Sequence, residues 1–324
     1  MYPSYLDLYH SGELAKRAEI LMSMLESCRV CPRICRVNRL GGEAGSCFSG
    51  YLPIVSSFCA HFGEEPVLVG QGGSGTIFFG NCNLRCVYCQ NSDISQNPHL
   101  EKNNEVEFEQ LAEKMVQLQK RGCHNINLVS PTQFVPQIIK SLIIAVSQGL
   151  NIPIVYNTNS YDSVEVLRLL DGIIDLYLPD IKYSNDEMAL RYSKVENYVL
   201  HSRAALKEMF RQVGLLEIDK NDIAQRGMII RHLVLPDNIA GTKESLQFLA
   251  EELSPLVTVS VMSQYHPVHK TLEYPELNRF ISEMEYHQAV EWLDIYEFEN
   301  GWTQDHVSRH HYLPNFNLPD PFTT

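Results

Sequence analysis

The sequence predicts an α/β fold, a partial (βα)6 TIM-like barrel with a small N-terminal cysteine-rich, metal-binding segment. Three observations predict it. Apolar runs of β-forming residues alternate with segments of helical period along the middle of the chain. Six such runs are present, enough to curl into an incomplete barrel through right-handed crossovers. Four of the nine cysteines are clustered ahead of the first run. A flat, doubly wound sheet is the alternative arrangement.

The barrel elements follow from local periodicity and from helix caps. Gly122, Gly149 and Gly214 stand where helix C-caps are expected, and Asp162 or Ser163 can cap a third, short helix. The expected strands cover residues 76–80, 125–130, 153–158, 174–179, 228–235 and 257–262. The expected helices carry the apolar positions of residues 108–118, 135–146, 166–170 and 206–213.

These elements divide the chain into three parts. Residues 1–65 form an N-terminal helix and the four-cysteine segment, residues 66–275 form the barrel, and residues 276–324 form a C-terminal helix and a tail that covers the barrel. We interpret His310 and His311 of the tail as solvated or hydrogen-bonded rather than as ligands.

Composition limits the function classes. With 324 residues, 44% hydrophobic and 20% charged, the chain can bury a full core. A net charge of -13 does not support a broad basic surface for nucleic acid or an anionic membrane. The N-terminus has no uninterrupted apolar stretch for a signal peptide or a membrane span, so we expect a cytoplasmic protein. Clustered cysteines in that reducing compartment indicate metal ligands rather than disulfides.

One cysteine cluster follows the first strand directly. Cys82, Cys86 and Cys89 have the spacing C-x3-C-x2-C at the end of the barrel where catalysis takes place. Three thiolates can bind three irons of a 4Fe-4S cluster and leave the fourth iron open, whereas electron-transfer clusters normally take four cysteines. A structural zinc site is the alternative, but three cysteines leave it under-ligated.

This spacing, with Tyr88 before the last cysteine, resembles the signature of the radical S-adenosylmethionine (SAM) superfamily. The resemblance implies two cofactors, a 4Fe-4S cluster and SAM, with Cys82, Cys86 and Cys89 as cluster ligands and catalytic residues. It also implies reductive cleavage of SAM to a 5′-deoxyadenosyl radical, which abstracts hydrogen from a substrate. An electron donor such as flavodoxin or ferredoxin is the implied partner.

Between residues 25 and 269 the chain resembles a narrower branch, the PflX-like proteins similar to pyruvate formate-lyase activating enzyme. In DLYLPDIKY, Asp180 and Lys182 are implied contacts of the SAM ribose or methionyl carboxylate. In IIRHLVLP, Arg231 is implied to approach the cofactor and the backbone of Leu233 to contact adenine. The other implied cofactor-binding residues are Tyr88, Thr158 and Asn159 of YNTNSYD, and His266, beside Tyr265, of SQYHPVHK.

Three of these residues also have a simple structural interpretation. Thr158 and Asn159 are also common turn residues, and a histidine in a loop such as His266 is more often only hydrogen-bonded. The chain also departs from the family where a Gly-Gly-Glu segment usually binds the methionyl amine. It has SPTQF there, so we expect carbonyl or hydroxyl oxygens of Ser130, Pro131 and Thr132 to contact the amine.

The N-terminal cysteines form a second array. Cys28, Cys31, Cys35 and Cys47 have the spacing C-x2-C-x3-C-x11-C, interrupted by turn-forming Pro and Gly residues. Tetrahedral zinc and a second 4Fe-4S cluster both explain four thiolates. Zinc would make this segment a structural or docking module, and a cluster would make it an electron relay or substrate-side site.

Three functions follow from these motifs. The first is a radical SAM oxidoreductase that activates a glycyl radical enzyme, which requires a protein or peptide substrate. The second is a radical SAM maturase that modifies another peptide or a small molecule. The third is a non-catalytic scaffold stabilised by metal at both cysteine sites.

Overall fold

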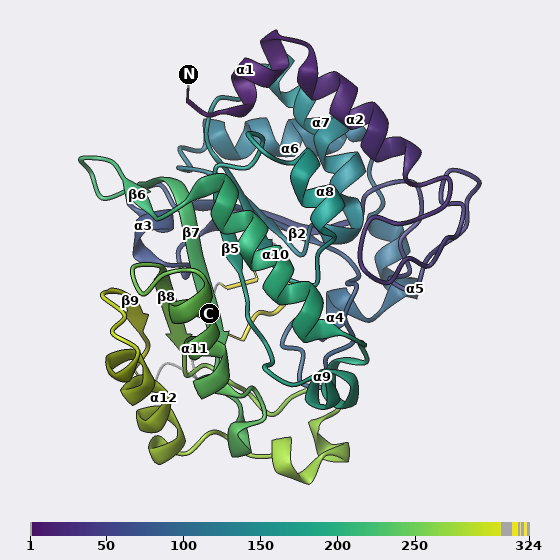
Figure 1. The fold of residues 1–324 in the computed structure, drawn as a ribbon. Coiled ribbons are helices and arrows are strands. Elements are labelled where there is room, and N and C mark those ends of the chain that lie inside the picture. Colours follow the sequence, from purple (N-terminus) through teal and green to yellow (C-terminus); the bar gives the residue numbers. More distant parts are fainter. Residues whose placement is uncertain (1, 306–312, 317, 319–320, 323–324) are drawn as a thin grey trace.

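The computed structural model describes residues 2–305, 313–316, 318 and 321–322, and one curved sheet forms its centre (Figure 1). The strand order is β1-β2-β3-β4-β5-β7-β8-β9, and β6 pairs with β7 beside this path. The strands are β1 (Val55–His61), β2 (Ser74–Phe79), β3 (Ile126–Val129), β4 (Ile154–Thr158), β5 (Leu176–Pro179), β6 (Glu217–Ile218), β7 (Ala224–Leu233), β8 (Thr258–Met262) and β9 (Asn300–Thr303).

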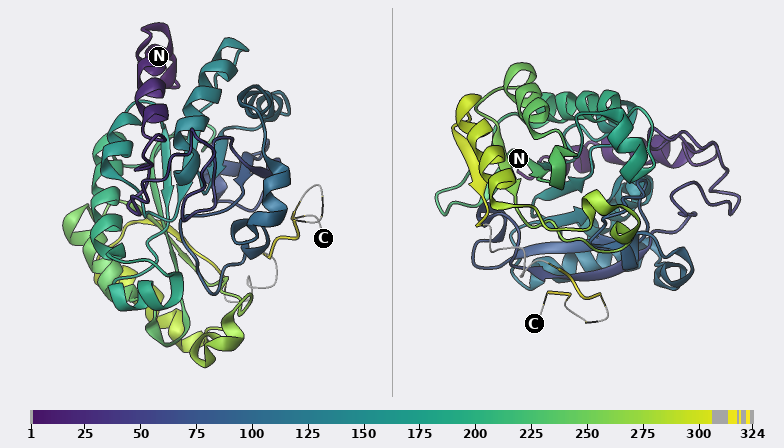
Figure 2. Two further views of the ribbon diagram at one scale, coloured as in Figure 1. Left: turned by 90° about the vertical axis from the view of Figure 1, so that its right-hand side faces the viewer. Right: turned by 90° about the horizontal axis from the view of Figure 1, so that it is seen from below.

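The predicted fold class is confirmed. Strands β2, β3, β4, β5, β7 and β8 correspond to the six expected runs, and every neighbouring pair among them is parallel. The sheet curves, and helices surround its outer side, as in an incomplete barrel (Figure 2). Two flanking strands were not expected: β1 pairs antiparallel with β2, and β9 pairs parallel with β8.

The helices begin and end largely as local sequence predicts. Gly122 and Gly149 directly follow the last turns of α6 and α7 with left-handed backbone, and Gly214 ends α10. Ser163, rather than Asp162, precedes α8. The helices are α1 (Tyr5–His10), α2 (Glu13–Ser23), α3 (Pro66–Val69), α4 (Ser92–Ser95), α5 (Pro98–Glu101), α6 (Phe108–Lys120), α7 (Val135–Ser147), α8 (Val164–Leu169), α9 (Asp186–Ser193), α10 (Tyr198–Val213), α11 (Thr242–Glu252) and α12 (Glu283–Ile295), with short 3-10 turns η1 (Lys102–Asn104), η2 (Thr132–Phe134), η3 (Pro236–Asn238), η4 (Thr271–Glu273) and η5 (Pro275–Leu277).

The period of two along the strands separates an outer from an inner core. Outward residues such as Leu128, Tyr156 and Ile230 join the large cluster that includes the helices. Inward residues such as Val155 and Ile229 form a smaller cluster with Leu68 of α3. Because these inward residues lie toward the amino-terminal half of their strands, α3 closes that end of the barrel. Side chains therefore fill the amino-terminal end of the barrel interior.

The first helices belong to the outer wall of the barrel. Helix α2 packs on α7 and α8 through its buried residues Leu14 and Leu21. Tyr5 donates to the carbonyl of Ile152 (2.8 Å), and Arg17 donates to the carbonyl of Asp171 (2.5 Å). The segment predicted as the N-terminal part thus contributes two helices to the wall and β1 to the sheet.

The C-terminal part lies along the far edge of the sheet and across the barrel. The Tyr286 hydroxyl of α12 donates to the carbonyl of Val261 in β8 (3.0 Å). The rings of Phe316 and Phe322 pack against Phe78 of β2. His310 and His311 lie outside the residues that the structure describes. Among the described helices, none has the length and apolar character needed to cross a membrane.

We predict that Leu21→Ala lowers the free energy of unfolding by about 2–5 kcal/mol, because it leaves a cavity between α2 and the barrel wall. Its neighbour Ile20, 47% exposed, provides a matched control, and Ile20→Ala should have little effect. Urea denaturation of both variants measures the difference. Equal, small losses would mean that α2 does not depend on this contact.

Candidate active site

The cysteine triad lies in a loop that leaves β2 at the carboxyl end of the barrel. Asn81 adopts a left-handed backbone conformation (φ 62°), which asparagine tolerates better than most residues, and turns the chain directly after the strand. The Asn81 amide donates to the carbonyl of Ile94 (2.7 Å), and its carbonyl accepts from Gln133 Nε2 (3.1 Å). The loop therefore starts from a fixed point.

The rest of the loop is held by the end of α9. The amide of Arg85 donates to the carbonyl of Ser193 (3.0 Å), and the amide of Val87 donates to the carbonyl of Tyr192 (2.8 Å). These contacts join residues more than one hundred positions apart in the sequence. They fix a segment that has little regular secondary structure of its own.

Each triad thiol has a hydrogen-bond partner. Cys86 Sγ accepts from the Ser193 hydroxyl (3.0 Å), Cys89 Sγ lies 3.2 Å from the Ser95 hydroxyl, and Cys82 Sγ accepts from the Leu84 amide (3.4 Å). Cys86 and Cys89 line a cavity inside the barrel, and Cys82 is not among its lining residues.

The pKa values of the triad thiols indicate what kind of ligand they can bind. Burial raises the pKa of Cys86 to about 12, although Lys182 lowers it, and the other triad thiols raise it further. Burial also raises the pKa of Cys89. Bound iron would supply the positive charge that three neighbouring thiolates need, so the donors fit an iron-sulfur cluster. Within the described part of the chain, no three His, Cys, Asp or Glu side chains are arranged to hold a single metal ion.

The cavity occupies the barrel interior between the triad and α3. Its volume is about 460 Å³, within the range of small-molecule pockets. Four of the residues predicted to contact SAM line it in addition to Tyr88. They are Asp180 after β5, Lys182 two residues later, and Arg231 and Leu233 of β7.

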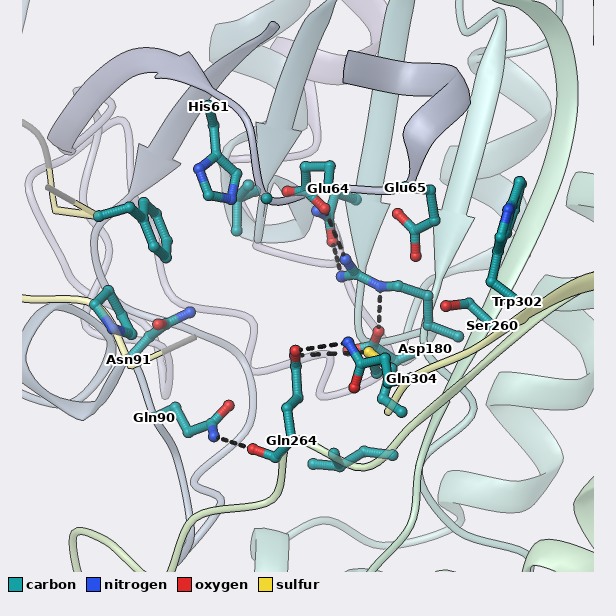
Figure 3. A pocket seen from close by; sticks show the side chains of 18 of the residues that line it. His61, Glu64, Glu65, Gln90, Asn91, Asp180, Ser260, Gln264, Trp302 and Gln304 are labelled. Carbon is teal, nitrogen blue, oxygen red and sulfur yellow. Dashed lines mark hydrogen bonds and ion pairs between the residues drawn. The ribbon is translucent and has the colours of Figure 1, made fainter. Parts of the chain in front are cut away.

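A half-buried charge network joins three of these residues to Glu64 on the floor of the cavity. Figure 3 shows Glu64 and Asp180 on opposite sides of this network. Arg231 donates to Asp180 Oδ1 (3.0 Å), to Glu64 Oε2 (3.1 Å) and to Asn157 Oδ1 (2.7 Å). Lys182 Nζ lies 2.7 Å from Asp180 Oδ2. Arg231 therefore points into the barrel interior.

The charges of this network reinforce one another. Although burial disfavours the carboxylate, Lys182 and Arg231 hold the pKa of Asp180 below its usual value. Burial likewise disfavours the ammonium of Lys182 and the guanidinium of Arg231, but Asp180 raises the pKa of both. All three groups therefore stay ionised inside the barrel at neutral pH.

The sequence did not point to two residues of the cavity floor. Glu64 and Glu65 lie between β1 and α3, and α3 places both side chains inside the barrel (Figure 3). Burial raises the pKa of both carboxyls. Glu65 Oε2 is buried and has no hydrogen-bond partner among the described residues. The sequence signal that could have found them is an acidic pair directly before the apolar run Pro66–Val69.

Three other predicted residues form contacts beside the cavity. The hydroxyls of Thr132 and Thr158 donate to the Asp162 carboxylate at 2.8 and 2.6 Å. Asn159 Nδ2 donates to Asn83 Oδ1 (2.8 Å) and lies 3.5 Å from Cys82 Sγ. Asn159 therefore contacts a cluster ligand, while the two threonines hydrogen-bond a buried acid. Their contacts with SAM stay predictions.

The remaining predicted residues are placed as follows. Tyr88 is buried, with its hydroxyl 2.8 Å from that of Tyr183. Ser130 has a left-handed backbone (φ 57°) directly after β3. His266 packs edge-on against the Phe280 ring, outside the set of cavity-lining residues. The cofactor roles of these residues also stay predictions.

The four N-terminal cysteines come together away from the triad cavity. Cys28, Cys31, Cys35 and Cys47 line one small cavity, and Gln133 of η2 lies on its barrel side. The predicted metal-binding array is therefore a convergent group of thiols in the folded chain.

A further residue positions the charge network from outside. His232 is buried on the outer face of β7, and its Nδ1 lies 2.9 Å from the carbonyl of Ile181. Its Nε2 lies 2.9 Å from the Thr242 hydroxyl of α11. Because a carbonyl only accepts, Nδ1 carries the proton and Nε2 accepts from Thr242. The ring thereby fixes the backbone between Asp180 and Lys182.

Comparisons with known proteins agree with this geometry. The model of the radical SAM superfamily matches residues 76–249, and the chain belongs to this superfamily. It is 35% identical over 305 residues to the uncharacterized protein MJ0674 of Methanocaldococcus jannaschii, covering 92% of this chain and 80% of that protein. It is 25% identical over 309 residues to MJ0808 of the same organism, covering 89% and 84%.

Solved structures also resemble the fold. One is HydG, a maturase of the [FeFe]-hydrogenase, with 13% identity and a TM-score of 0.46 over 68% of this chain and 49% of HydG. Another is TYW1 with a lysine-pyruvate adduct bound, with 9% identity and a TM-score of 0.41 over 72% and 78%. Membership of the superfamily implies an enzyme that uses a 4Fe-4S cluster and SAM.

The buried histidine predicts a pH dependence of stability. Burial lowers the pKa of His232 to about 4, so between about pH 6.5 and pH 4 the unfolded chain binds more protons at this residue. Its contribution is complete above pH 6.5, and we expect roughly 3 kcal/mol of it to be lost as the pH falls to 4.

The measurement compares the free energy of unfolding of the wild type and His232→Gln across this range. Buried carboxyls with raised pKa values change the free energy of unfolding with pH in the opposite direction, and they do so equally in both proteins. The contribution of His232 is therefore the difference between the wild type and the variant. The exposed His287→Gln variant should follow the wild type. A difference that does not change with pH would contradict the assignment.

Proposed function

We propose that the barrel binds SAM between the cysteine triad and the charge network, and that the protein cleaves it reductively to start radical chemistry. The observation that carries this proposal is a single cavity that joins Cys86 and Cys89 to Asp180, Lys182 and Arg231. When bound at the triad, the cluster supplies one electron, which breaks the C5′–S bond of SAM and yields methionine and the 5′-deoxyadenosyl radical. A one-electron donor such as flavodoxin or ferredoxin would supply that electron.

The charged side chains suit the two ends of SAM. An ammonium such as Lys182 pairs with a carboxylate, and a carboxylate such as Asp180 accepts hydrogen bonds from ribose hydroxyls. Since Arg231 holds Asp180 from the opposite side, Asp180 stays in place when a ligand approaches Lys182. Leu233 lies one inward position beyond Arg231 and offers its backbone to adenine.

The methionyl amine needs oxygen acceptors, and Ser130 and Thr132 are the proposed ones. The Thr132 hydroxyl already donates its proton to Asp162, but its oxygen retains lone pairs that can accept. The left-handed backbone of Ser130 turns the chain directly at the carboxyl end of β3. Both residues follow β3, the point in the chain at which the family carries its amine-binding segment.

The substrate position is the floor of the cavity. Glu65 offers a buried oxygen atom that lacks a hydrogen-bond partner among the described residues. Such an atom favours a substrate that carries an N–H or ammonium donor, because an unsatisfied buried acceptor is costly. A peptide backbone and a small amine both meet this requirement.

The resemblance to pyruvate formate-lyase activating enzyme suggests a glycine of a partner enzyme as the substrate. In that reaction, the 5′-deoxyadenosyl radical takes a hydrogen atom from the glycine α-carbon, giving 5′-deoxyadenosine and a glycyl radical. A glycyl-radical signal in electron paramagnetic resonance on a candidate partner would identify this reaction. Deuterium transfer from another labelled peptide or small molecule to 5′-deoxyadenosine would identify a maturase instead.

We predict that Cys86→Ser abolishes the conversion of SAM to 5′-deoxyadenosine and methionine by reduced, anaerobically reconstituted protein. The serine cannot replace the thiolate that holds one iron of the cluster. Cys123→Ser is the matched control, because Cys123 is equally buried but lies far from the triad in the sequence and does not line the cavity. Chromatography of the products measures both variants. Undiminished turnover by Cys86→Ser would reject the assignment of SAM cleavage to this cysteine triad.

We also predict that Lys182→Met raises the Kd for SAM by roughly 10- to 100-fold, since hydrogen bonds to charged groups contribute about 1.5–3 kcal/mol. The control is Lys207→Met, which removes an exposed ammonium paired with Glu252. Calorimetric titration of the reconstituted proteins gives the two dissociation constants. An unchanged Kd for Lys182→Met would place the methionyl carboxylate elsewhere.

A further inference from the structure

The four N-terminal cysteines form a built site in the folded chain. All four line one cavity, and Cys28, Cys31 and Cys47 are buried. Left-handed backbone at Ile34 and Arg36 folds the segment back on itself. The Cys28 amide then donates to the carbonyl of Val37 (2.9 Å), and the Arg36 amide donates to the carbonyl of Cys28 (3.0 Å).

A glycine shows how closely the thiols of this site approach. A Cβ atom at Gly45 would lie 2.9 Å from Cys35 Sγ and 3.8 Å from Cys47 Sγ. The first distance is shorter than a side chain tolerates, so glycine is required where the backbone passes these two sulfur atoms. The sulfur atoms of Cys35 and Cys47 therefore lie on the same side of this turn.

A buried cation faces the same cavity. Arg39 is fully buried, and its Nη1 lies 4.0 Å from Cys28 Sγ. Its guanidinium donates to the carbonyls of Gly50 (2.8 Å) and Gln133 (2.7 Å), while Nη2 is buried without a hydrogen-bond partner among the described residues. No carboxylate of the described chain forms a salt bridge with it. An anionic centre at the cysteines would offset this charge, since a buried unpaired cation is costly.

The site lies directly against the loop of the barrel triad. One guanidinium, that of Arg85, donates to the carbonyl of Cys82 (2.5 Å) and to the carbonyl of Ser46 (2.6 Å), the residue before Cys47. The same guanidinium lies over the Phe48 ring. Arg33 and Asn81 add two further hydrogen bonds between the loops, to the carbonyls of Asn83 (2.5 Å) and Phe48 (3.1 Å).

We propose that Cys28, Cys31, Cys35 and Cys47 ligate a second 4Fe-4S cluster that passes single electrons to the cluster of the barrel triad. Four cysteines are the normal ligand set of an electron-transfer cluster and leave no iron open. In such a cluster each cysteine binds a different iron, which suits thiols arranged around a cavity. Zinc has no redox chemistry, so it would make no use of a position against the triad loop.

The electron balance is simple. A one-electron protein donor of the flavodoxin or ferredoxin class reduces the second cluster, which returns to its oxidised state when it reduces the triad cluster. The second cluster thus undergoes no net change in a turnover. The transfer of the electron to the triad cluster rests on the proposed function. The presence of the second cluster does not rest on it.

The first test is the metal content of anaerobically reconstituted full-length protein. We expect about eight irons per chain in the wild type and about four in Cys28→Ser/Cys31→Ser and in Cys82→Ser/Cys86→Ser/Cys89→Ser. About one zinc per chain, with iron lost only in the triad variant, would overturn the proposal. So would about four irons in the wild type.

A second measurement needs no cysteine variant. Arg39→Gln should lower the midpoint potential of the second cluster, because it removes a buried positive charge beside that cluster. The control is Arg36→Gln, which removes an exposed arginine of the same segment and should leave the potential unchanged. If the midpoint potentials of the two variants are equal, there is no cluster beside Arg39 and the proposal is wrong. Addition of SAM should change only the resonance of the other cluster, which has the open iron.

A comparison of two reductants, dithionite and flavodoxin, tests whether the second cluster passes electrons to the triad cluster. Cys28→Ser/Cys31→Ser should keep SAM cleavage with dithionite, which can reduce the triad cluster directly, and lose most of the rate with flavodoxin. An undiminished flavodoxin-driven rate would overturn the relay. A wild type that carries two clusters but does not cleave SAM would refute the proposed function and leave the second cluster standing.

Discussion

The guanidinium of Arg231 lies inside a barrel and is only 16% exposed, so its charge needs partners there. The pairing joins three separate elements. Asp180 follows β5, Asn157 belongs to β4, and Glu64 lies in the segment before α3. A single side chain therefore fixes the wall and the floor of the cavity relative to each other. Removal of Arg231 would leave the Glu64 carboxylate without the guanidinium that pairs with it.

This pairing also explains how the site can bind a charged cofactor. Asp180 lies between two cations, Arg231 and Lys182, and keeps its negative charge despite its burial. Lys182 belongs to the same network but faces the triad cavity, so it can exchange part of its contact with Asp180 for a ligand carboxylate. His232 and Tyr198 support this segment from outside, through the carbonyl of Ile181 and the amide of Lys182. The charges are thus arranged before any ligand arrives, which lowers the cost of binding.

The cysteine loop depends on contacts with segments far away in the sequence. Its backbone is bound by the end of α9, by Gln133 of η2 and by the N-terminal cysteine segment. Arg85 donates to carbonyls of both cysteine loops, and Arg33 and Asn81 add two further hydrogen bonds between them. Two groups of thiols that the sequence separates by some tens of residues are therefore parts of one continuous structure, and this proximity is the basis for treating them as partners in electron transfer.

By itself, the sequence determined the features that local pattern controls. Periodicity two in the strands and three to four in the helices determined the six parallel strands and the main helices, and the C-x3-C-x2-C spacing after β2 identified the superfamily. Only the tertiary structure decided that Glu64 meets Arg231, 167 positions later, and that Thr132 and Thr158 share Asp162. It also decided that β1 and β9 extend the sheet. The physical reason is that a buried charge and an edge strand pair with whatever the tertiary fold brings next to them. The local sequence around each residue does not indicate which distant segment that is.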